Sequence, residues 1–219
     1  IKKSSFSKKY HYLWGYLWKA MGKKLLHTTG YDEEGRIIHI NEAERGGIYT
    51  CPLCQERIIA RNEGKSQRPH FAHFKKADMG CNGETLLLHL FRQKAIELLN
   101  ARIERKEPFP IHWSCPLCNR QYEKNLLQQV SSLTTDLNIE GHRPEITLLN
   151  GQGQPIFAIK LLIRRKLTKK TLLFYEEKGI ILIQIALEED DWMRVEEKLS
   201  HPESVTFCSN AECYNFQFY

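Results

Sequence analysis

The sequence contains no apolar run that approaches the ~18 residues needed to cross a membrane. The apolar stretch at residues 13–18 is interrupted by Gly15 and stopped by Lys19, so it is not the hydrophobic region of a secretory signal peptide. Acidic residues are absent from residues 1–31. The first two absences predict a cytoplasmic protein without a membrane partner, and the third predicts a basic N-terminal arm over residues 1–30.

This arm combines positive charge with aromatic rings. It interleaves seven lysines with Phe6, Tyr10, Tyr12, Trp14, Tyr16 and Trp18. Such a pattern suits phosphate contact and base stacking on a single strand of nucleic acid. It also suits an arm that docks its aromatic rings on the main domain and leaves its lysines in water. Both interpretations stay open from the sequence.

The overall composition points to a globular protein with a basic surface. The 219 residues are 42% hydrophobic, which is enough for one main domain with small modules. The net charge of +6 and the pI of about 8.9 are compatible with a nucleic-acid partner. Seven cysteines without an export signal indicate metal binding in a reducing compartment rather than disulfides.

Residues 31–82 carry the first metal-binding pattern. Cys51 and Cys54 form a CxxC pair, a returning strand brings His70 and His73, and Cys81 follows eight residues later. Two thiolates from a CxxC turn can bind one tetrahedral ion, and a short module of this kind has too little core to fold without it. The spacing predicts a structural zinc ion, but it does not decide which two of His70, His73 and Cys81 complete the site.

A second CxxC pair follows the long helix that we predict over residues 83–105. Neither an HxxH pair nor a third cysteine follows Cys115 and Cys118 nearby in the sequence, and the remaining cysteines are Cys208 and Cys213. These four residues predict an all-thiolate zinc ribbon that joins residues 115–118 to residues 208–213 and raises the zinc content from one ion to two. The alternative is that the last two are free buried thiols.

The periodicity of residues 83–219 predicts a mixed α/β core. The expected order is a helix, a strand leading into the second CxxC pair, a polar and weakly helical stretch, two hairpin strands, a helix over 166–178, a strand over 180–187 and an acidic helix over 188–199. A helix that crosses between two sheet strands is typical of a sheet flanked by helices.

The two hairpin strands, residues 146–149 and 155–163, carry charges that could do chemistry. Asp136, Glu140 and Glu145 lead into the first strand, and Lys160 lies inside the second. Carboxylates and a lysine together suit a metal-dependent phosphodiesterase. The simpler interpretation is a surface hairpin with a salt-bridged lysine, because a charge within a buried strand needs a partner.

Several motifs together resemble the competence protein CoiA-like family. They are YDEEGRIIHINEAERGGIYTCPLC, HFAH, Cys81, a helix that begins with GET, and RPE followed by a hairpin, within residues 31–187. The resemblance implies a zinc-binding module and a restriction-endonuclease-like PD-(D/E)XK nuclease domain, with Mg²⁺ or Mn²⁺ if the domain is active. It places Glu84 at the family's helix glutamate, Asp136 at an upstream acid and Arg143, Pro144 and Glu145 at its RPD motif.

The sequence departs from this family pattern in the second hairpin strand. A carboxylate followed two residues later by lysine is expected there, but the chain has Ala158 and Lys160, or in the other register Lys160 and Leu162. Losing a carboxylate ligand should weaken Mg²⁺ binding, and a lysine would attract phosphate instead. We therefore expect nucleic-acid binding, to DNA rather than RNA, with cleavage lost or impaired. The expected contacts are Arg143, Lys160, Arg164, Arg165, Lys166, Lys169 and Lys170.

Two other functions stay open. The protein can be an active nuclease that holds its metal through Asp136, Glu140 and Glu145, with help from Glu84 or His89. It can also be a zinc-stapled interaction module with protein partners in a DNA-processing or defence assembly.

Overall fold

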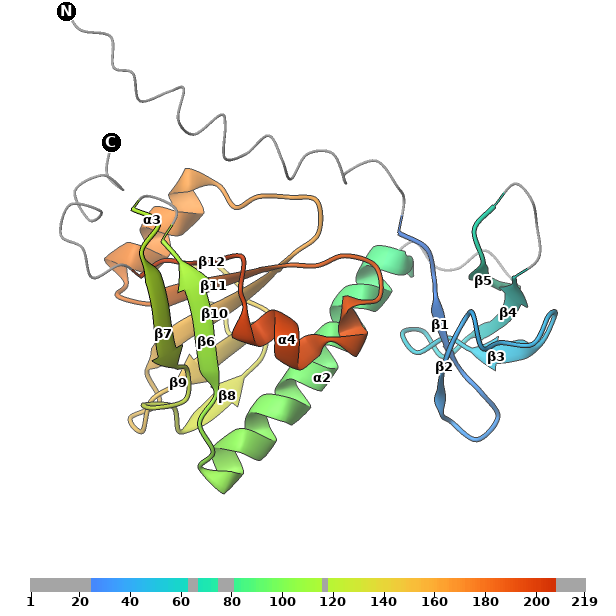
Figure 1. Ribbon diagram of the computed structural model, residues 1–219, viewed down its shortest axis with the longest axis horizontal. Coiled ribbons are helices and arrows are strands. Elements are labelled where there is room, and N and C mark those ends of the chain that lie inside the picture. The colour runs from blue at the N-terminus through green and yellow to red at the C-terminus, as the bar shows by residue number, and fades with distance from the viewer. Residues whose placement is uncertain (1–24, 63–66, 75–80, 116–117, 208–219) are drawn as a thin grey trace, which may run out of the picture.

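A computed structural model describes residues 25–62, 67–74, 81–115 and 118–207. Figure 1 shows a small sheet that lies beside a larger core. Most of the predicted N-terminal arm, up to residue 24, lies outside the described residues. Within the described part, none of the helices combines the length and the apolar character needed to span a bilayer.

The small sheet has five antiparallel strands in the order β2-β1-β3-β4-β5. Its strands are β1 (Thr29–Tyr31), β2 (Ile37–His39), β3 (Ile48–Thr50), β4 (Arg57–Arg61) and β5 (His70–His73). Strand β1 pairs with β2, and β4 pairs with β5, which confirms the predicted returning strand that carries His70 and His73. Ile40, Ile58 and Phe71 are the largest side chains of its small buried cluster.

Helix α2 (Gly83–Arg105) has the predicted bounds and connects the small sheet to the core. Its start is fixed by Asn82, whose side chain accepts hydrogen bonds from the backbone N–H groups of Glu84 and Thr85. Gly83 is required there, because a Cβ atom would lie 2.6 Å from the carbonyl oxygens of Leu25 and Leu26. The first turn of α2 therefore packs tightly against the segment that precedes β1.

The main sheet is mixed and has the strand order β12-β11-β10-β9-β8. Its strands are β8 (Ser132–Thr134), β9 (Ile146–Leu149), β10 (Pro155–Leu162), β11 (Ile181–Ala186) and β12 (Ser204–Val205). Strands β10 and β11 are parallel, and helix α3 (Lys169–Glu177) makes the crossover between them. The predicted mixed α+β fold, with helices flanking a sheet and a small β module before it, is confirmed.

The polar stretch that we predicted to be weakly helical is instead partly strand. Residues Gln121–Asn125 form β7, which pairs with β6 (Pro110–Ser114) as a separate hairpin, and β8 follows it. The turn at Cys115 reverses the chain, so the polar residues that follow pair with β6 rather than coiling. The predicted acidic helix is also shorter, since a 3-10 turn, η2 (Asp191–Met193), precedes α4 (Val195–Ser200).

The two faces of the main sheet differ, as side chains alternate along each strand. Ile159 and Leu161 of β10 belong to the large cluster that includes the buried face of α2. Ala158 belongs to a smaller cluster with Tyr175 of α3. Lys160 alternates with Ile159 and Leu161, so it lies on the α3 face together with Ala158.

The small sheet contacts the core through the loop that precedes η2. Asp190 accepts a hydrogen bond from the Thr28 hydroxyl group at 2.8 Å and lies 3.3 Å from His39 Nε2. Glu189 accepts a hydrogen bond from the Leu26 N–H group and pairs with Arg68. These polar contacts flank the tight packing of Gly83, so both ends of the small sheet are attached to the core.

Candidate metal centre

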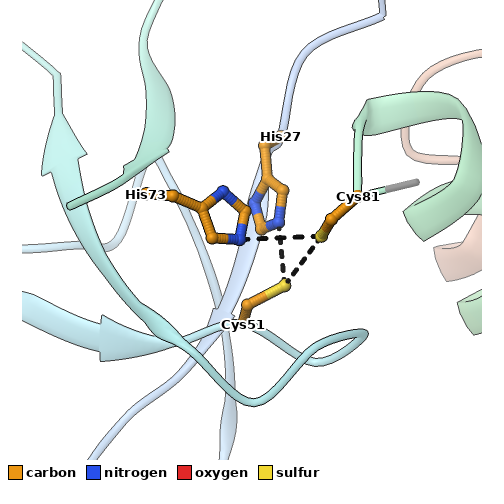
Figure 2. Close-up of side chains that lie close together, drawn as sticks. All are labelled: His27, Cys51, His73 and Cys81. Atoms are coloured by element: carbon orange, nitrogen blue, oxygen red, sulfur yellow. Dashed lines mark hydrogen bonds between the residues drawn. The ribbon is translucent and has the colours of Figure 1, made fainter. Parts of the chain in front are cut away.

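Four side chains of the small sheet converge on one point beside the start of α2. Figure 2 shows that His27, Cys51, His73 and Cys81 point toward one another. His27 Nε2 lies 3.2 Å from Cys51 Sγ, Cys51 Sγ lies 3.5 Å from Cys81 Sγ, and Cys81 Sγ lies 3.6 Å from His73 Nε2. A fifth donor, Cys54 Sγ, lies 3.2 Å from His73 Nε2.

Short-range structure positions each of these donors. Cys51 follows β3, its N–H group donates to the Glu56 carbonyl oxygen, and its own carbonyl oxygen accepts from the Gln55 N–H group. Gln55 adopts a φ of 61°, which closes the turn that carries Cys51 and Cys54. His73 ends β5, Cys81 lies two residues before α2, and His27 lies two residues before β1. The site therefore joins three segments of the small sheet to the first turn of the core helix.

The donor spacing fits a tetrahedral zinc ion. Zinc binds sulfur at about 2.3 Å and nitrogen at about 2.0–2.1 Å, so donor atoms at tetrahedral angles lie roughly 3.3–3.8 Å apart. The observed separations of 3.2–3.6 Å match this range closely. Two to three thiols with one or two imidazoles are also the donor set that zinc prefers. The cluster can hold a zinc ion.

Burial disfavours the charged forms of four donors, Cys51, Cys81, His73 and His27. It raises the pKa of the Cys51 and Cys81 thiols, because a thiolate is poorly solvated there. It lowers the pKa of His73, and it lowers that of His27 to about 4, with smaller contributions from the neighbouring His73 and His70. Two buried thiolates without a cation would be costly, whereas a divalent ion would stabilise both.

The structure shows which of the predicted donors lie close together. His73 and Cys81 lie in the cluster, whereas the His70 Nδ1 atom lies 2.9 Å from the Arg68 carbonyl oxygen. His27 was missed, because we placed residues 1–30 in a basic arm. The signal for it was topological: β1 pairs with β3 at Tyr31 and Thr50, directly before Cys51, so a histidine just before β1 lies near that cysteine.

The second CxxC pair is described only in part. Cys115 is buried and Cys118 is half-buried, and they pack beside Tyr122 in the hairpin of β6 and β7. Cys208 and Cys213 lie outside the described residues. Among the residues that the structure describes, the cluster around Cys51 is the only group of three or more His, Cys, Asp or Glu side chains with donor atoms within reach of one another.

The predicted carboxylate site of the core is occupied by an ion pair. Glu145 Oε1 lies 3.0 Å from Lys160 Nζ, and Glu145 Oε2 accepts the Leu161 N–H group at 3.0 Å. Lys160 also donates to the Arg143 carbonyl oxygen at 2.8 Å. Both side chains are mostly buried, with exposed fractions of 19% for Lys160 and 23% for Glu145. The salt-bridged lysine of the simpler interpretation is therefore what the hairpin contains.

Each of the other predicted acidic ligands pairs with a different arginine or lysine side chain. Asp136 lies 3.4 Å from Arg92, Glu84 lies 3.4 Å from Arg164, and Glu140 pairs with Lys178. Asp136 and Glu140 both have positive φ angles, in turns that leave their side chains largely exposed. The described residues do not bring Asp136, Glu140 and Glu145 together as a metal site, and His89 is half-buried on α2 outside any such group.

Six of the seven predicted nucleic-acid contacts lie at the surface. Arg143 immediately precedes the Pro144–Glu145 entry to β9, Lys160 lies in β10, and the others follow β10 or begin α3. All but Lys160 are exposed: Arg143, Arg164, Arg165, Lys166, Lys169 and Lys170. The structure therefore presents basic side chains on both sides of the Glu145–Lys160 pair along the chain.

One comparison with known proteins gave a match. Residues 35–82 match the family described as competence protein CoiA, N-terminal domain. The match contains Cys51, Cys54, His73 and Cys81, and it ends directly before α2. His27 lies outside it. Neither the curated proteins nor the solved structures gave a match to this chain.

Proposed function

We propose that this protein is a zinc-stapled, nucleic-acid-binding protein whose core binds phosphate groups without hydrolysing them. The observation that carries the proposal is the Glu145–Lys160 ion pair, which lies where the resemblance to CoiA-like proteins implies a catalytic metal. The zinc ion is structural in this proposal: Cys51, His73 and Cys81, with His27 or Cys54 as the fourth ligand, would hold it and would tie the small sheet to α2.

The local chemistry opposes a Mg²⁺ ion beside Glu145. Mg²⁺ needs near-octahedral oxygen ligands, and both oxygens of Glu145 already accept hydrogen bonds. The Lys160 ammonium group lies 3.0 Å away and would repel a cation. With Lys160 at the lysine position of the family pattern, the carboxylate position in β10 is taken by Ala158. This residue has no exposed surface and packs in one cluster with Tyr175.

The same arrangement favours an anion. The Lys160 side chain is 19% exposed, and its ammonium group donates to the carbonyl oxygen of Arg143. The Arg143 residue is itself exposed. Lys169 and Lys170 form the first turn of α3, where the helix dipole adds partial positive charge to that of the side chains. A phosphate backbone passing this edge of the sheet would meet several cationic side chains. These side chains would release counterions that are condensed on the nucleic acid.

The test is a titration of fluorescently labelled single-stranded DNA, duplex DNA and single-stranded RNA between 50 and 200 mM salt. We expect the affinity to fall steeply with salt for at least one of these ligands. Neutralising Lys169→Gln/Lys170→Gln should weaken binding about tenfold or more and make the slope of log K against log salt shallower by roughly 1.5, because two phosphate contacts are lost.

The matched control is Arg61→Gln/Arg105→Gln, which removes the same charge from exposed residues of β4 and of the last turn of α2. It should change the affinity less than twofold. The same samples, incubated with Mg²⁺ or Mn²⁺, should yield no cleavage products. Product bands that disappear in Glu145→Ala would instead establish a nuclease, and no binding at 50 mM salt would favour a protein-interaction module.

A further inference from the structure

A histidine lies flat on a phenylalanine ring beside the entry to β9. The ring centres of His142 and Phe174 are 3.9 Å apart, and their planes differ by 15°. Phe174 belongs to α3 and packs against the small cluster around Tyr175, whose ring meets His142 edge-on at 5.8 Å. The core therefore holds Phe174 in place, and Phe174 supports one face of the imidazole ring.

A tight turn fixes the backbone of His142. Its N–H and carbonyl groups exchange hydrogen bonds with those of Ile139 at 2.9 and 2.8 Å. The two residues between them, Glu140 and Gly141, have φ angles of 49° and 91°, and a type I′ turn requires positive values at both positions. The Asn138 side chain accepts a further hydrogen bond from the Gly141 N–H group at 2.8 Å. An ordered turn thus presents the ring, which lowers the entropic cost of binding a ligand.

The imidazole ring keeps its polar atoms available. His142 is half-buried, and neither of its ring nitrogens has a hydrogen-bond partner among the described residues. Neither nitrogen is fully buried, so solvent or a ligand can reach both. An aromatic ring of this kind can stack on a nucleic-acid base and can also form a hydrogen bond with the edge of the base.

Lysine side chains flank the aromatic pair on two sides. Lys170 precedes Phe174 by four residues, so both lie on one face of α3. Lys160 Nζ lies 2.8 Å from the carbonyl oxygen of Arg143, the residue that follows His142. A nucleotide that places its base on the imidazole ring would therefore have its phosphate groups near these ammonium groups.

We propose that the His142–Phe174 pair is a stacking platform for an unpaired base, so that the protein prefers single-stranded to duplex nucleic acid. The inference rests on the proposed function, because phosphate contacts at the same edge of the sheet must hold the strand. In a duplex, neighbouring bases cover both faces of each base, so a duplex offers this platform little besides its phosphates. Every base has a π-face, so the platform should accept any base of single-stranded DNA or RNA.

The test compares two ligands of equal length that differ in their bases, a labelled oligothymidylate and an abasic deoxyribose-phosphate oligomer. Titrated at 50 mM salt, the wild-type protein should bind the oligothymidylate about 5- to 150-fold more tightly, the range that one stacked base provides. His142→Ala should remove this difference, whereas His142→Phe, which keeps a ring, should retain it. Duplex DNA of the same length should bind equally to the wild-type protein and to His142→Ala.

The matched control is His201→Ala. His201 also stacks on a ring, that of His112 at 5.3 Å, but it follows α4, which packs on the α2 side of the main sheet. This variant should keep the wild-type preference for the oligothymidylate. His142→Ala should also keep the hydrogen-exchange protection of β9–β11, which shows that its core is folded.

The comparison of ligands on the wild-type protein does not depend on the folding of any variant. An oligouridylate titrated in parallel shows whether RNA or DNA supplies the base, and a preference for either over the abasic ligand supports the inference. Equal affinity for all three, or a preference that survives in His142→Ala, would overturn the inference and leave the proposed function intact. Absence of binding to every ligand at 50 mM salt would overturn both.

Discussion

The small sheet and the core differ most in how much apolar side chain they bury. Among the described residues, the cluster of the small sheet has six buried members, and three of them are Ala43, Ala60 and Cys51. The main cluster of the core has twenty-three, including Phe91, Trp113 and Trp192. A sheet with so little core is marginal by itself, whereas the core buries enough to fold unaided. From this difference we expect a metal ion to stabilise the small sheet and apolar packing to stabilise the core.

Removing the metal should have the largest effect, and it should fall on the small sheet. Structural zinc ions contribute roughly 10–16 kcal/mol of apparent binding free energy in small modules, which exceeds what six buried residues provide. We expect Cys81→Ser and His73→Gln to lose this ion and the hydrogen-exchange protection of β3–β5. The core strands β9–β11 should keep theirs.

The strand that carries His73 also provides the control. His70 lies three residues earlier on β5 but outside the donor cluster, so His70→Gln should keep the zinc ion and the protection of β3–β5. Persistent protection of these strands in chelator-treated wild-type protein would contradict the metal's role. Equal loss of zinc in both histidine variants would contradict the ligand assignment.

A cavity in the core should destabilise the core and leave the zinc content of the small sheet unchanged. Phe91 is fully buried in the face of α2 that packs on the main sheet. Phe91→Ala should reduce the free energy of unfolding of the core by about 3–5 kcal/mol, as a large buried side chain is replaced by a cavity. Denaturant unfolding, followed by exchange in β9–β11, measures this change. The zinc content should stay at the wild-type value, and its loss would show that the two parts are not independent.

The sequence was most informative where local signals determine the structure. The bounds of α2 follow from Asn82 as its N-cap and from the apolar spacing along the helix, and the strands around Cys51 follow from short hairpins. The CxxC turn and the strand with His73 could be assigned to one metal for the same reason. The mixed sheet with its crossover helix also followed from the order of its apolar segments.

One error came from a hairpin whose second strand is polar, and the others came from contacts that are distant in sequence. β7 is polar and has no strand periodicity of its own, so it becomes a strand only because the turn at Cys115 folds it onto β6. His27 lies 24 residues before Cys51 and looks like part of a basic arm until the pairing of β1 with β3 brings it near. The four predicted acids are separated because each lies beside a different basic residue from another segment.

The smallest expected effect is that of replacing His27, and it resolves whether His27 or Cys54 binds the ion. Cys51, His73 and Cys81 lie within reach of one ion together with His27, and the CxxC turn offers Cys54 as the alternative fourth ligand. If Cys54 is the ligand, His27 contacts the Cys51 sulfur and not the metal. His27→Gln should then weaken zinc binding by about 10- to 100-fold, as for other residues that orient a ligand. Cys54→Ser should weaken it much more. Competition with a chromophoric chelator measures the zinc affinity of both variants. The Cys115→Ser/Cys118→Ser background keeps the second CxxC pair out of the measurement.

The pH dependence of the zinc affinity shows how many cysteines bind the ion. Burial raises the pKa of the Cys51 and Cys81 thiols, so they hold their protons near neutral pH, and every coordinating thiol releases one proton when zinc binds. Burial lowers the pKa of His73 and His27, so between about pH 6.5 and 8 they bind as neutral rings and release none. The affinity must therefore fall as the pH falls, with a slope of three for log K against pH if Cys54 is a ligand. A slope of two in the wild-type protein, unchanged in Cys54→Ser, would instead place His27 on the metal.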